Sequence, residues 1–357
     1  MTAIPTRVKQ LLSAPEKILT DYNLVYVNDA DFLISRKKRG RGFGYDLAGK
    51  RITDKTELKR IKRLAIPPMW NEVKVTHVKE GHLQAYGRDD KKRKQYRYHP
   101  TWIKIRQQTK FYKMVSFGNQ LPSIREKVDQ DLDQKGWPKS KVIALVIRLM
   151  EETHIRIGNA QYAKRNKTYG LTTLRKRHVA LHRDRIKFQF IGKKGKAHEV
   201  TIRNKKLIRL VSRCEEIPGW ELFKYYDENG QKQTLESSMI NTYLQQISAD
   251  FFSAKDFRTW AGSVVFFETL LPLGTPATAK ERHVNVLAGF DQAAKALGNT
   301  RNVCKKYYVH PLLVSSYEEG TLDPYLVQAN NSTTDQPYFT KTEAIMLQFI
   351  TQHSPAF

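Results

Sequence analysis

The segment LGNTRNVCKKYYVHP, residues 297–311, gathers residue types that could carry out a phosphoryl transfer. Two adjacent tyrosines, Tyr307 and Tyr308, follow a basic turn and precede His310 and Pro311. A tyrosine hydroxyl is a poor nucleophile at neutral pH unless cations or hydrogen-bond donors stabilise its oxyanion and the charge on its target. In a basic protein that target would be a phosphodiester. Taken alone, the segment is better explained as a C-terminal helix with core and rim tyrosines, so other segments must decide.

A first arginine that could hold a phosphate follows the strongest predicted helix, residues 141–159. Arg156 lies seven residues beyond Leu149, which would bring it back to nearly the same face as the apolar stripe. An arginine in that place needs a strong partner. The partner would be a buried carboxylate, with Glu151 and Glu152 close in sequence, or a phosphate gripped by the two-pronged guanidinium.

A further arginine, together with a lysine, lies just inside a helix predicted to begin near residues 253–254. Lys255 and Arg258 are three residues apart and therefore share a helix face. This spacing suits a phosphate. A salt bridge with Asp256 or Glu268 is the structural alternative.

Residues 183–203 predict a β-hairpin with a cationic tip. Apolar residues alternate on both arms, and the tip reads Gly192-Lys193-Lys194-Gly195-Lys196. A lysine there could reach into a groove and meet a phosphate or a leaving oxygen. Such lysines are usually only solvated, and spacing does not say which of the three matters.

The stretch QAYGRDDKKRKQYRYHP, residues 84–100, combines cations with planar side chains. Arg93 and its basic neighbours could meet phosphates, and Gln95, Tyr96 and Tyr98 could meet sugars and base edges. A solvated turn would explain the lysines. It would not explain Tyr96 and Tyr98, which on a strand point to one face, so DNA contact is favoured.

The elements that must position these residues divide into two kinds. After a short helical segment (8–19), residues 24–98 contain short β-prone segments (24–27, 32–35 and 72–78) and one lysine-rich helical segment (53–64). From Trp102 the apolar spacing becomes helical, with further helices expected at 284–297, capped by Gly298, and at 341–352, and a strand at 172–174. We therefore predict an α+β protein: a small β-rich domain, residues 1–101, and a mostly α-helical domain, residues 102–357, that carries the hairpin.

Composition indicates the kind of partner. The 357 residues carry a formal net charge of +27, far beyond what solubility requires, so a polyanion is expected. The longest apolar run, residues 142–147, is too short to cross a bilayer, which favours nucleic acid over a membrane. Basic runs at 37–39 and 91–94 resemble nuclear-import signals but are equally explained as phosphate contacts.

Two widely separated cysteines, Cys214 and Cys304, make neither a disulfide framework nor a zinc site. Residues 1–17 lack the apolar core and cleavage site of a secretory signal. We therefore expect a reducing compartment, the cytoplasm, with a nucleus or virion as alternatives. No Walker loop or metal-ligand spacing occurs, so no cofactor and no metal is expected.

Taken together, two arginines, a hairpin lysine, a hydrogen-bond donor and a late tyrosine resemble the compact bacterial and poxvirus type IB DNA topoisomerases. The resemblance runs in order through THIRIGNAQYAKRNKTYGLTTLRKRHV (153–179), KFQFIGKKGK (187–196), AKDFRTWAGS (254–263), LGNTRNVCKKYYVHP (297–311) and, in the first domain, IPPMWNEVKV (66–75) and GRDDKKRKQYRYHP (87–100). It covers nearly the whole chain.

The resemblance implies a role for each candidate. Tyr308 would be the nucleophile and Tyr307 its non-catalytic neighbour. Arg156 and Arg258 would hold the non-bridging oxygens of the scissile phosphate, and Lys193 would protonate the departing 5′ oxygen. The enzyme would relax supercoiled duplex DNA through a 3′-phosphotyrosyl intermediate without ATP or a required metal, as a monomer that clamps the duplex.

Further positions follow from the same resemblance. Asn299 stands where poxvirus members carry a histidine; an amide cannot titrate, so it would act by orientation only. Lys255 fits an auxiliary phosphate contact. Tyr162, like Gln95, Tyr96 and Tyr98, matches a DNA-touching position.

Two other classes remain in competition. Tyrosine recombinases share the arginine, lysine and tyrosine chemistry and the catalytic-domain fold, but they normally carry a histidine two residues before the second arginine, where Asp256 stands. A non-enzymatic architectural DNA-binding protein would need only the charge.

Overall fold

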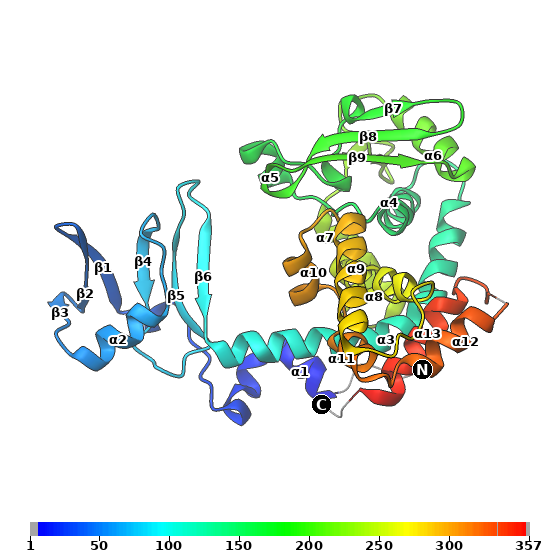
Figure 1. Cartoon of the computed structure of the whole chain (residues 1–357). Helices are drawn as coiled ribbons and strands as arrows, with labels where there is room; N and C mark the ends of the chain where they lie inside the picture. The colour runs from blue at the N-terminus through cyan, green and yellow to red at the C-terminus, as the bar shows by residue number, and fades with distance from the viewer. Residues whose placement is uncertain (1–5, 334, 355–357) are drawn as a thin grey trace. The chain divides into compact units, whose positions relative to one another are not determined.

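The computed structural model describes residues 6–333 and 335–354, which form two compact units, residues 6–110 and 111–354. The division falls inside the long helix α3 (Pro100–Leu132), and the boundary predicted at residues 101 and 102 lies at the start of this helix. The predicted fold class is confirmed, with strands dominating the first unit and helices the second (Figure 1). In the described ranges, no helix combines the length and hydropathy of a bilayer-spanning segment.

The first unit is built on one antiparallel sheet in the order β3-β2-β1-β4-β5-β6 (Figure 1). Its strands are β1 (Ile34–Arg39), β2 (Gly42–Leu47), β3 (Lys50–Arg51), β4 (Asn71–Val75), β5 (Leu83–Arg88) and β6 (Lys94–Tyr98). The predicted lysine-rich helix is confirmed as α2 (Lys55–Arg63), which packs Ile61 against Ile34 and Val75 of the sheet. The side chain of Asp54 caps this helix by accepting from two of its first backbone N–H groups.

Two local predictions for this unit are wrong. Residues 24–27 form no strand and contribute only an isolated bridge between Val25 and Gly81. The predicted lead helix over residues 8–19 ends early: α1 (Thr6–Ser13) gives way to short 3-10 turns. The chain turns there because Leu19 and Leu24 pack into a small core with Trp102. Burial of these side chains therefore overrides the local pattern.

The second unit is a helical body that carries small sheets. Its helices are the later part of α3, α4 (Lys139–Thr153), α5 (Ala160–Asn166), α6 (Lys205–Glu216), α7 (Ser237–Ser248), α8 (Ala254–Leu270), α9 (Ala279–Leu297), α10 (Arg301–Tyr307), α11 (Pro311–Glu319), α12 (Asp323–Asn331) and α13 (Lys341–His353). The strands β7 (Val179–Leu181), β8 (Ile186–Ile191) and β9 (Ala197–Ile202) form one antiparallel sheet, and β10 (Lys224–Tyr226) pairs with β11 (Lys232–Thr234). The predicted hairpin is confirmed as β8 and β9.

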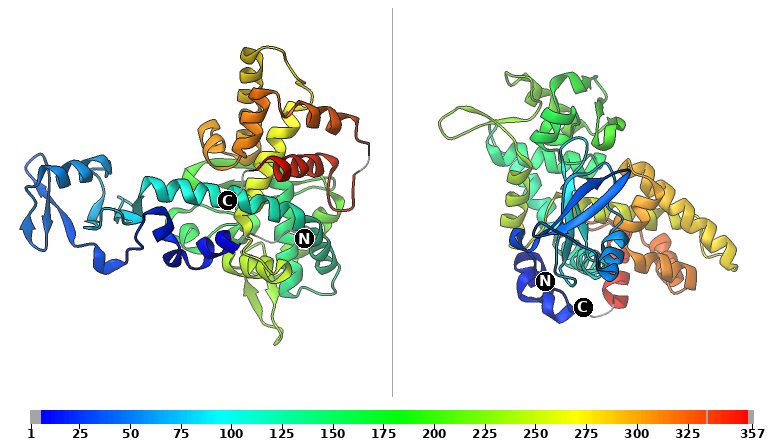
Figure 2. Two further views of the ribbon diagram at one scale, coloured as in Figure 1. Left: turned by 90° about the horizontal axis from the view of Figure 1, so that it is seen from below. Right: turned by 90° about the vertical axis from the view of Figure 1, so that its left-hand side faces the viewer.

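Helix α8 is the central element of this unit, because most of its residues are buried and it packs along α9. Its first turn is fixed by Asp256, whose carboxylate accepts from the backbone N–H and the hydroxyl of Ser253 and from the buried ammonium of Lys113. The C-terminal helix α13 lies beside α8 and the later part of α3 (Figures 1 and 2). Elements from distant parts of the sequence therefore hold α8 in place.

Two predictions for the second unit need correction. Helix α4 ends at Thr153, because His154 adopts a left-handed conformation (φ 53°), so Arg156 lies in a loop and not on the apolar stripe. Residues 172–174 do not begin a strand: residues 171–173 form a 3-10 turn whose Leu171 and Thr172 N–H groups bind carbonyls of the loop that carries Arg156. These hydrogen bonds shape both the Arg156 loop and the turn at residues 171–173. The residue patterns that predicted a helix and a strand here do not reveal them.

Candidate active site

Tyr308 stands at the end of a turn that several contacts fix. Helix α9 ends at Gly298, which is left-handed as predicted (φ 59°), and Tyr308 caps the C-terminus of α10. The hydroxyl of Ser263, on α8, donates to the carbonyl of Tyr308 (3.2 Å) and accepts from the N–H of His310 (3.0 Å). A Cβ on Gly262 would lie only 2.9 Å from the Cβ of Tyr308. Tyr308 therefore packs directly against α8 and is half-buried, whereas Tyr307 is 44% exposed.

Arg258 lies beneath this tyrosine and is only 5% exposed. Its guanidinium donates to the carbonyls of His154 and Leu297, the latter at 2.8 Å, and its Cζ lies 5.4 Å from the centre of the Tyr308 ring. The alternative of a salt bridge with Asp256 is wrong, since that carboxylate binds Lys113. The positive charge of Arg258 is thus held by neutral carbonyl dipoles.

Arg156 reaches the same site from its loop. Its Nη2 donates to the Oδ1 of Asn299 at 2.6 Å. The carboxylate alternative is wrong for Glu151, which is bound to Arg125 and Arg148. The arginine therefore again has a neutral partner.

Two buried donors of the site lack a hydrogen-bond partner within residues 6–333 and 335–354: the Nε of Arg258 and the Nδ2 of Asn299. An unsatisfied buried donor in a native fold requires an explanation, because it loses its hydrogen bonds to water without replacement. An anion bound between the two arginines would supply acceptors. The residues present therefore fit a phosphate.

Lys193 stands at the tip of the hairpin, where Lys194 and Gly195 both have positive φ angles (67° and 77°). Partial removal from water and the nearby charge of Arg156 lower the pKa of the Lys193 ammonium, while Tyr308 opposes this effect. Lys193 therefore lies within electrostatic reach of Arg156 and Tyr308.

The pKa of the Tyr308 hydroxyl is lowered by these neighbours. Burial is the largest influence and by itself would raise the pKa, but the charge and hydrogen bonding of Arg258, followed by the charges of Arg156 and Lys193, outweigh it. The oxyanion is therefore stabilised within a cluster of cations. This is the condition under which a tyrosine becomes a nucleophile.

Two predicted DNA contacts of the second unit, Lys255 and Tyr162, are exposed. Lys255 is exposed on the first turn of α8, and its charge also helps to lower the pKa of Lys193. Tyr162 is 52% exposed on α5, whose N-terminal cap is Asn159. Both side chains are therefore accessible to a ligand.

In the first unit, the other predicted DNA contacts lie on β6 and the turn before it. Tyr96 and Tyr98 stack with ring centres 5.9 Å apart, which confirms that they share a face. Sequence reasoning missed Asp89, whose carboxylate accepts from Arg93 (2.7 Å) and Gln95 (2.9 Å) and has its pKa lowered to about 2, chiefly by Arg93. Asp89 orients two of the candidate contacts, and its place in the turn before the cations at residues 91–94 was the only signal.

Within the described ranges, no three histidine, cysteine or acidic side chains are grouped closely enough to hold a metal ion. The arrangement that does exist is one tyrosine, two arginines, one lysine and one amide brought together from four separate segments. Its chemistry is the binding of a phosphate and the stabilisation of charge on and around it.

Comparison with known proteins agrees with this chemistry. Residues 93–322 match the family model of the eukaryotic DNA topoisomerase I catalytic core, and residues 42–89 match that of the bacterial DNA topoisomerase IB N-terminal domain. DNA topoisomerase 1B of Acanthamoeba polyphaga mimivirus is 32% identical over 296 residues, which cover 80% of this chain and 88% of the viral protein. DNA topoisomerase 1B of Vaccinia virus (strain Western Reserve) is 23% identical over 62% of this chain and 68% of its own length.

Proposed function

The chain belongs to the type IB DNA topoisomerases, isomerases that act on DNA, and from this premise we propose that it relaxes supercoiled duplexes through a covalent bond to Tyr308. The phenolic oxygen attacks the scissile phosphorus while its proton passes to solvent. A 3′-phosphotyrosyl ester forms as the bond from phosphorus to the 5′ oxygen breaks. The free strand end then rotates, and the reverse reaction reseals the backbone.

The catalytic roles are divided among the residues of the cluster. Arg156 and Arg258 stabilise the negative charge on the non-bridging oxygens, which two fixed guanidinium groups can do in place of a metal ion. Lys193, whose pKa is lowered, gives a proton to the departing 5′ oxygen. Asn299 orients Arg156 through its Oδ1 and offers its free Nδ2 to a phosphoryl oxygen.

The ester stores the energy of the broken backbone bond, so resealing needs no ATP, and no divalent metal is required. The two units bind the same duplex through separate sets of phosphate contacts, and the protein acts as a monomer in the cytoplasm. The observation that carries this proposal is the position of Tyr308 against two arginines whose charges are not neutralised by carboxylates.

The test is relaxation of a supercoiled plasmid of arbitrary sequence in EDTA and without ATP, a reaction that a recombinase dependent on paired sites would not perform. Tyr308→Phe should abolish both relaxation and the covalent protein–DNA adduct while it leaves duplex binding nearly intact. Tyr307→Phe is the matched control, because it removes the same hydroxyl from the exposed neighbour. Full activity of the Tyr308 variant, or loss only with Tyr307, would contradict the assignment.

A further inference from the structure

The imidazole of His198 fills a narrow space between two glycines of the catalytic unit. A Cβ on Gly192 would lie 2.5 Å from the Cδ2 of His198, and a Cβ on Gly298 would lie 2.8 Å from its Cε1. Real side chains do not approach so closely, so both glycines let the backbone meet the ring directly. The ring therefore lies between the hairpin loop at Gly192 and the turn at Gly298, and it sets the spacing of these two segments.

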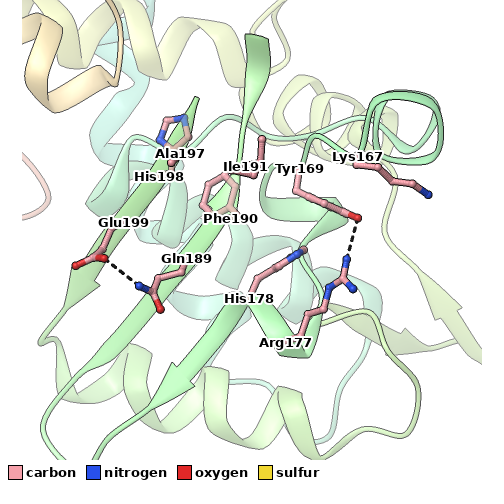
Figure 3. A pocket seen from close by; sticks show the side chains of 10 residues that line it. All are labelled: Lys167, Tyr169, Arg177, His178, Gln189, Phe190, Ile191, Ala197, His198 and Glu199. Atoms are coloured by element: carbon pink, nitrogen blue, oxygen red, sulfur yellow. Dashed lines mark hydrogen bonds between the residues drawn. The ribbon is translucent and has the colours of Figure 1, made fainter. Parts of the chain in front are cut away.

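One face of the ring is also fixed. His198 lies opposite Phe190 in the β8–β9 pairing, and the two rings stack with centres 5.1 Å apart and planes 8° apart (Figure 3). Both residues line a cavity of about 570 Å³ beside the hairpin (Figure 3). Loss of the imidazole would open this cavity toward the hairpin loop, because the space would no longer be filled.

The two segments that the ring separates carry catalytic candidates at their next residues. Gly192 precedes Lys193, and Gly298 precedes Asn299, which binds Arg156 at 2.6 Å. A shift of the loop against the turn would therefore move the ammonium group of Lys193 relative to the arginine that holds the phosphate.

The charge state of the ring suits this place. Burial first, and then the cations Arg156, Lys196 and Arg258, lower the pKa of His198, so the imidazole is neutral at neutral pH. A neutral ring can pack beside these cations without repelling them. Lysine or arginine in its place would add a like charge to the cluster.

We propose that His198 is a positioning residue for proton transfer: its ring sets the distance between the Lys193 loop and the Gly298–Asn299 turn. In this way it holds the ammonium group where the departing 5′ oxygen leaves. The inference rests on the proposed function of Lys193 as the proton donor, and the experiment separates the two.

The experiment compares cleavage of two duplexes that differ at one atom of a mapped cleavage site, the 5′-bridging oxygen or a sulfur in its place. A thiolate leaves without a proton donor, because a thiol has a pKa of about 8.5, far below that of an alcohol. His198→Ala should slow single-turnover cleavage of the oxygen substrate by about 10- to 100-fold, the usual cost of a misplacement near 1 Å. It should leave the sulfur substrate close to the wild-type rate. Glu199→Ala, at the exposed neighbouring residue, is the control and should change neither rate.

A second variant tests the spacing while the imidazole is kept. Gly192 has φ −97°, which alanine tolerates, so Gly192→Ala should act only through its contact with the ring. Gly192→Ala should slow cleavage of the oxygen substrate but not of the sulfur substrate. Combined with His198→Ala it should cause little further slowing, because the ring that residue 192 contacts is then absent. This outcome is accessible even if His198→Ala folds poorly.

The outcomes are distinct. If Lys193→Ala is not rescued by sulfur, the proposed function of Lys193 fails. Suppose instead that sulfur rescues Lys193→Ala. If His198→Ala then slows cleavage of both substrates equally, or slows neither, only the role of His198 is overturned. Additive losses in the Gly192 and His198 double variant would also overturn it.

Discussion

Removal of Glu343 should destabilise the catalytic unit strongly, although this residue lies on the C-terminal helix and belongs to no candidate site. Glu343 is 4% exposed and accepts two hydrogen bonds from Arg125, both at 2.8 Å, and one from the indole of Trp260 at 2.7 Å. Breaking one partner of a buried ion pair typically costs about 3–5 kcal/mol. A lost hydrogen bond that leaves a buried donor unsatisfied costs about 1–3 kcal/mol.

These costs do not add in full. Arg125 keeps a second carboxylate, Glu151 at 2.8 Å, so its charge is not left without compensation. We therefore expect Glu343→Ala to lower the free energy of unfolding by roughly 3–4 kcal/mol, the lower part of the range for a broken buried ion pair. Glu343→Gln keeps an acceptor for Trp260 and loses only the charge, so its effect should be about half as large.

Stability should also depend on pH through this carboxylate. Burial alone would raise the pKa of Glu343, but the hydrogen bonds and charge of Arg125 and the bond from Trp260 outweigh it and lower the pKa. A lowered folded pKa means that the stabilisation is complete above the unfolded value of about 4.3 and is lost as the pH falls through the folded pKa. The difference between wild type and Glu343→Ala should therefore shrink only in acid.

Urea denaturation followed by circular dichroism measures these differences. Glu318→Ala is the matched control, because it removes a half-exposed carboxylate that pairs with the exposed His283. An unfolding free energy for Glu343→Ala within about 0.5 kcal/mol of wild type, the range of a surface substitution, would refute the reasoning. If the difference in unfolding free energy between wild type and Glu343→Ala grew as the pH fell, the pKa of Glu343 could not be lowered in the folded protein.

Three further outcomes concern the site and its ligand. Arg258→Lys keeps the charge but cannot make both carbonyl bonds, so single-turnover adduct formation should fall by about 10²–10³-fold; a loss below threefold would contradict it. The wild-type protein should show one more tyrosine ionisation in its ultraviolet absorbance than Tyr308→Phe does. The pKa of this ionisation should lie below the usual tyrosine value of about 10 and should rise in Arg258→Ala. An unchanged pKa in Arg258→Ala would exclude that arginine as the cause. A plot of log duplex affinity against log salt concentration should fall steeply, by about 0.9 per phosphate contacted, and a flat plot would contradict binding through many phosphate contacts.

Local signals predicted much of this molecule correctly. Gly298 indicated the end of a helix because glycine readily adopts the left-handed conformation, and α8 began at its predicted residue because Ser253 caps it. The stacked pair Tyr96 and Tyr98 followed from the period of a strand. Such features depend on neighbours in sequence.

Features that depend on distant segments were missed. The position of Arg156 was wrong because a left-handed residue at His154 ends α4, and the loop beyond it is shaped by hydrogen bonds to residues 171–172. His198 looked like an ordinary strand residue, since its contact with Gly298 joins positions 100 residues apart. No period or motif in a single sequence encodes such contacts.

The partners of the arginines show why this cluster is suited to an anion. Elsewhere in the second unit, some half-buried arginines are neutralised by carboxylates, as Arg125 is by Glu151 and Glu343 and Arg148 is by Asp129. At the site, Arg156 and Arg258 are instead held by an amide oxygen and by backbone carbonyls. Neutral acceptors fix the direction of a guanidinium without cancelling its charge, so the desolvation cost of both cations stays uncompensated in the free protein. A phosphate would provide that compensation, and most fully when its charge is greatest, in the transition state of the transfer.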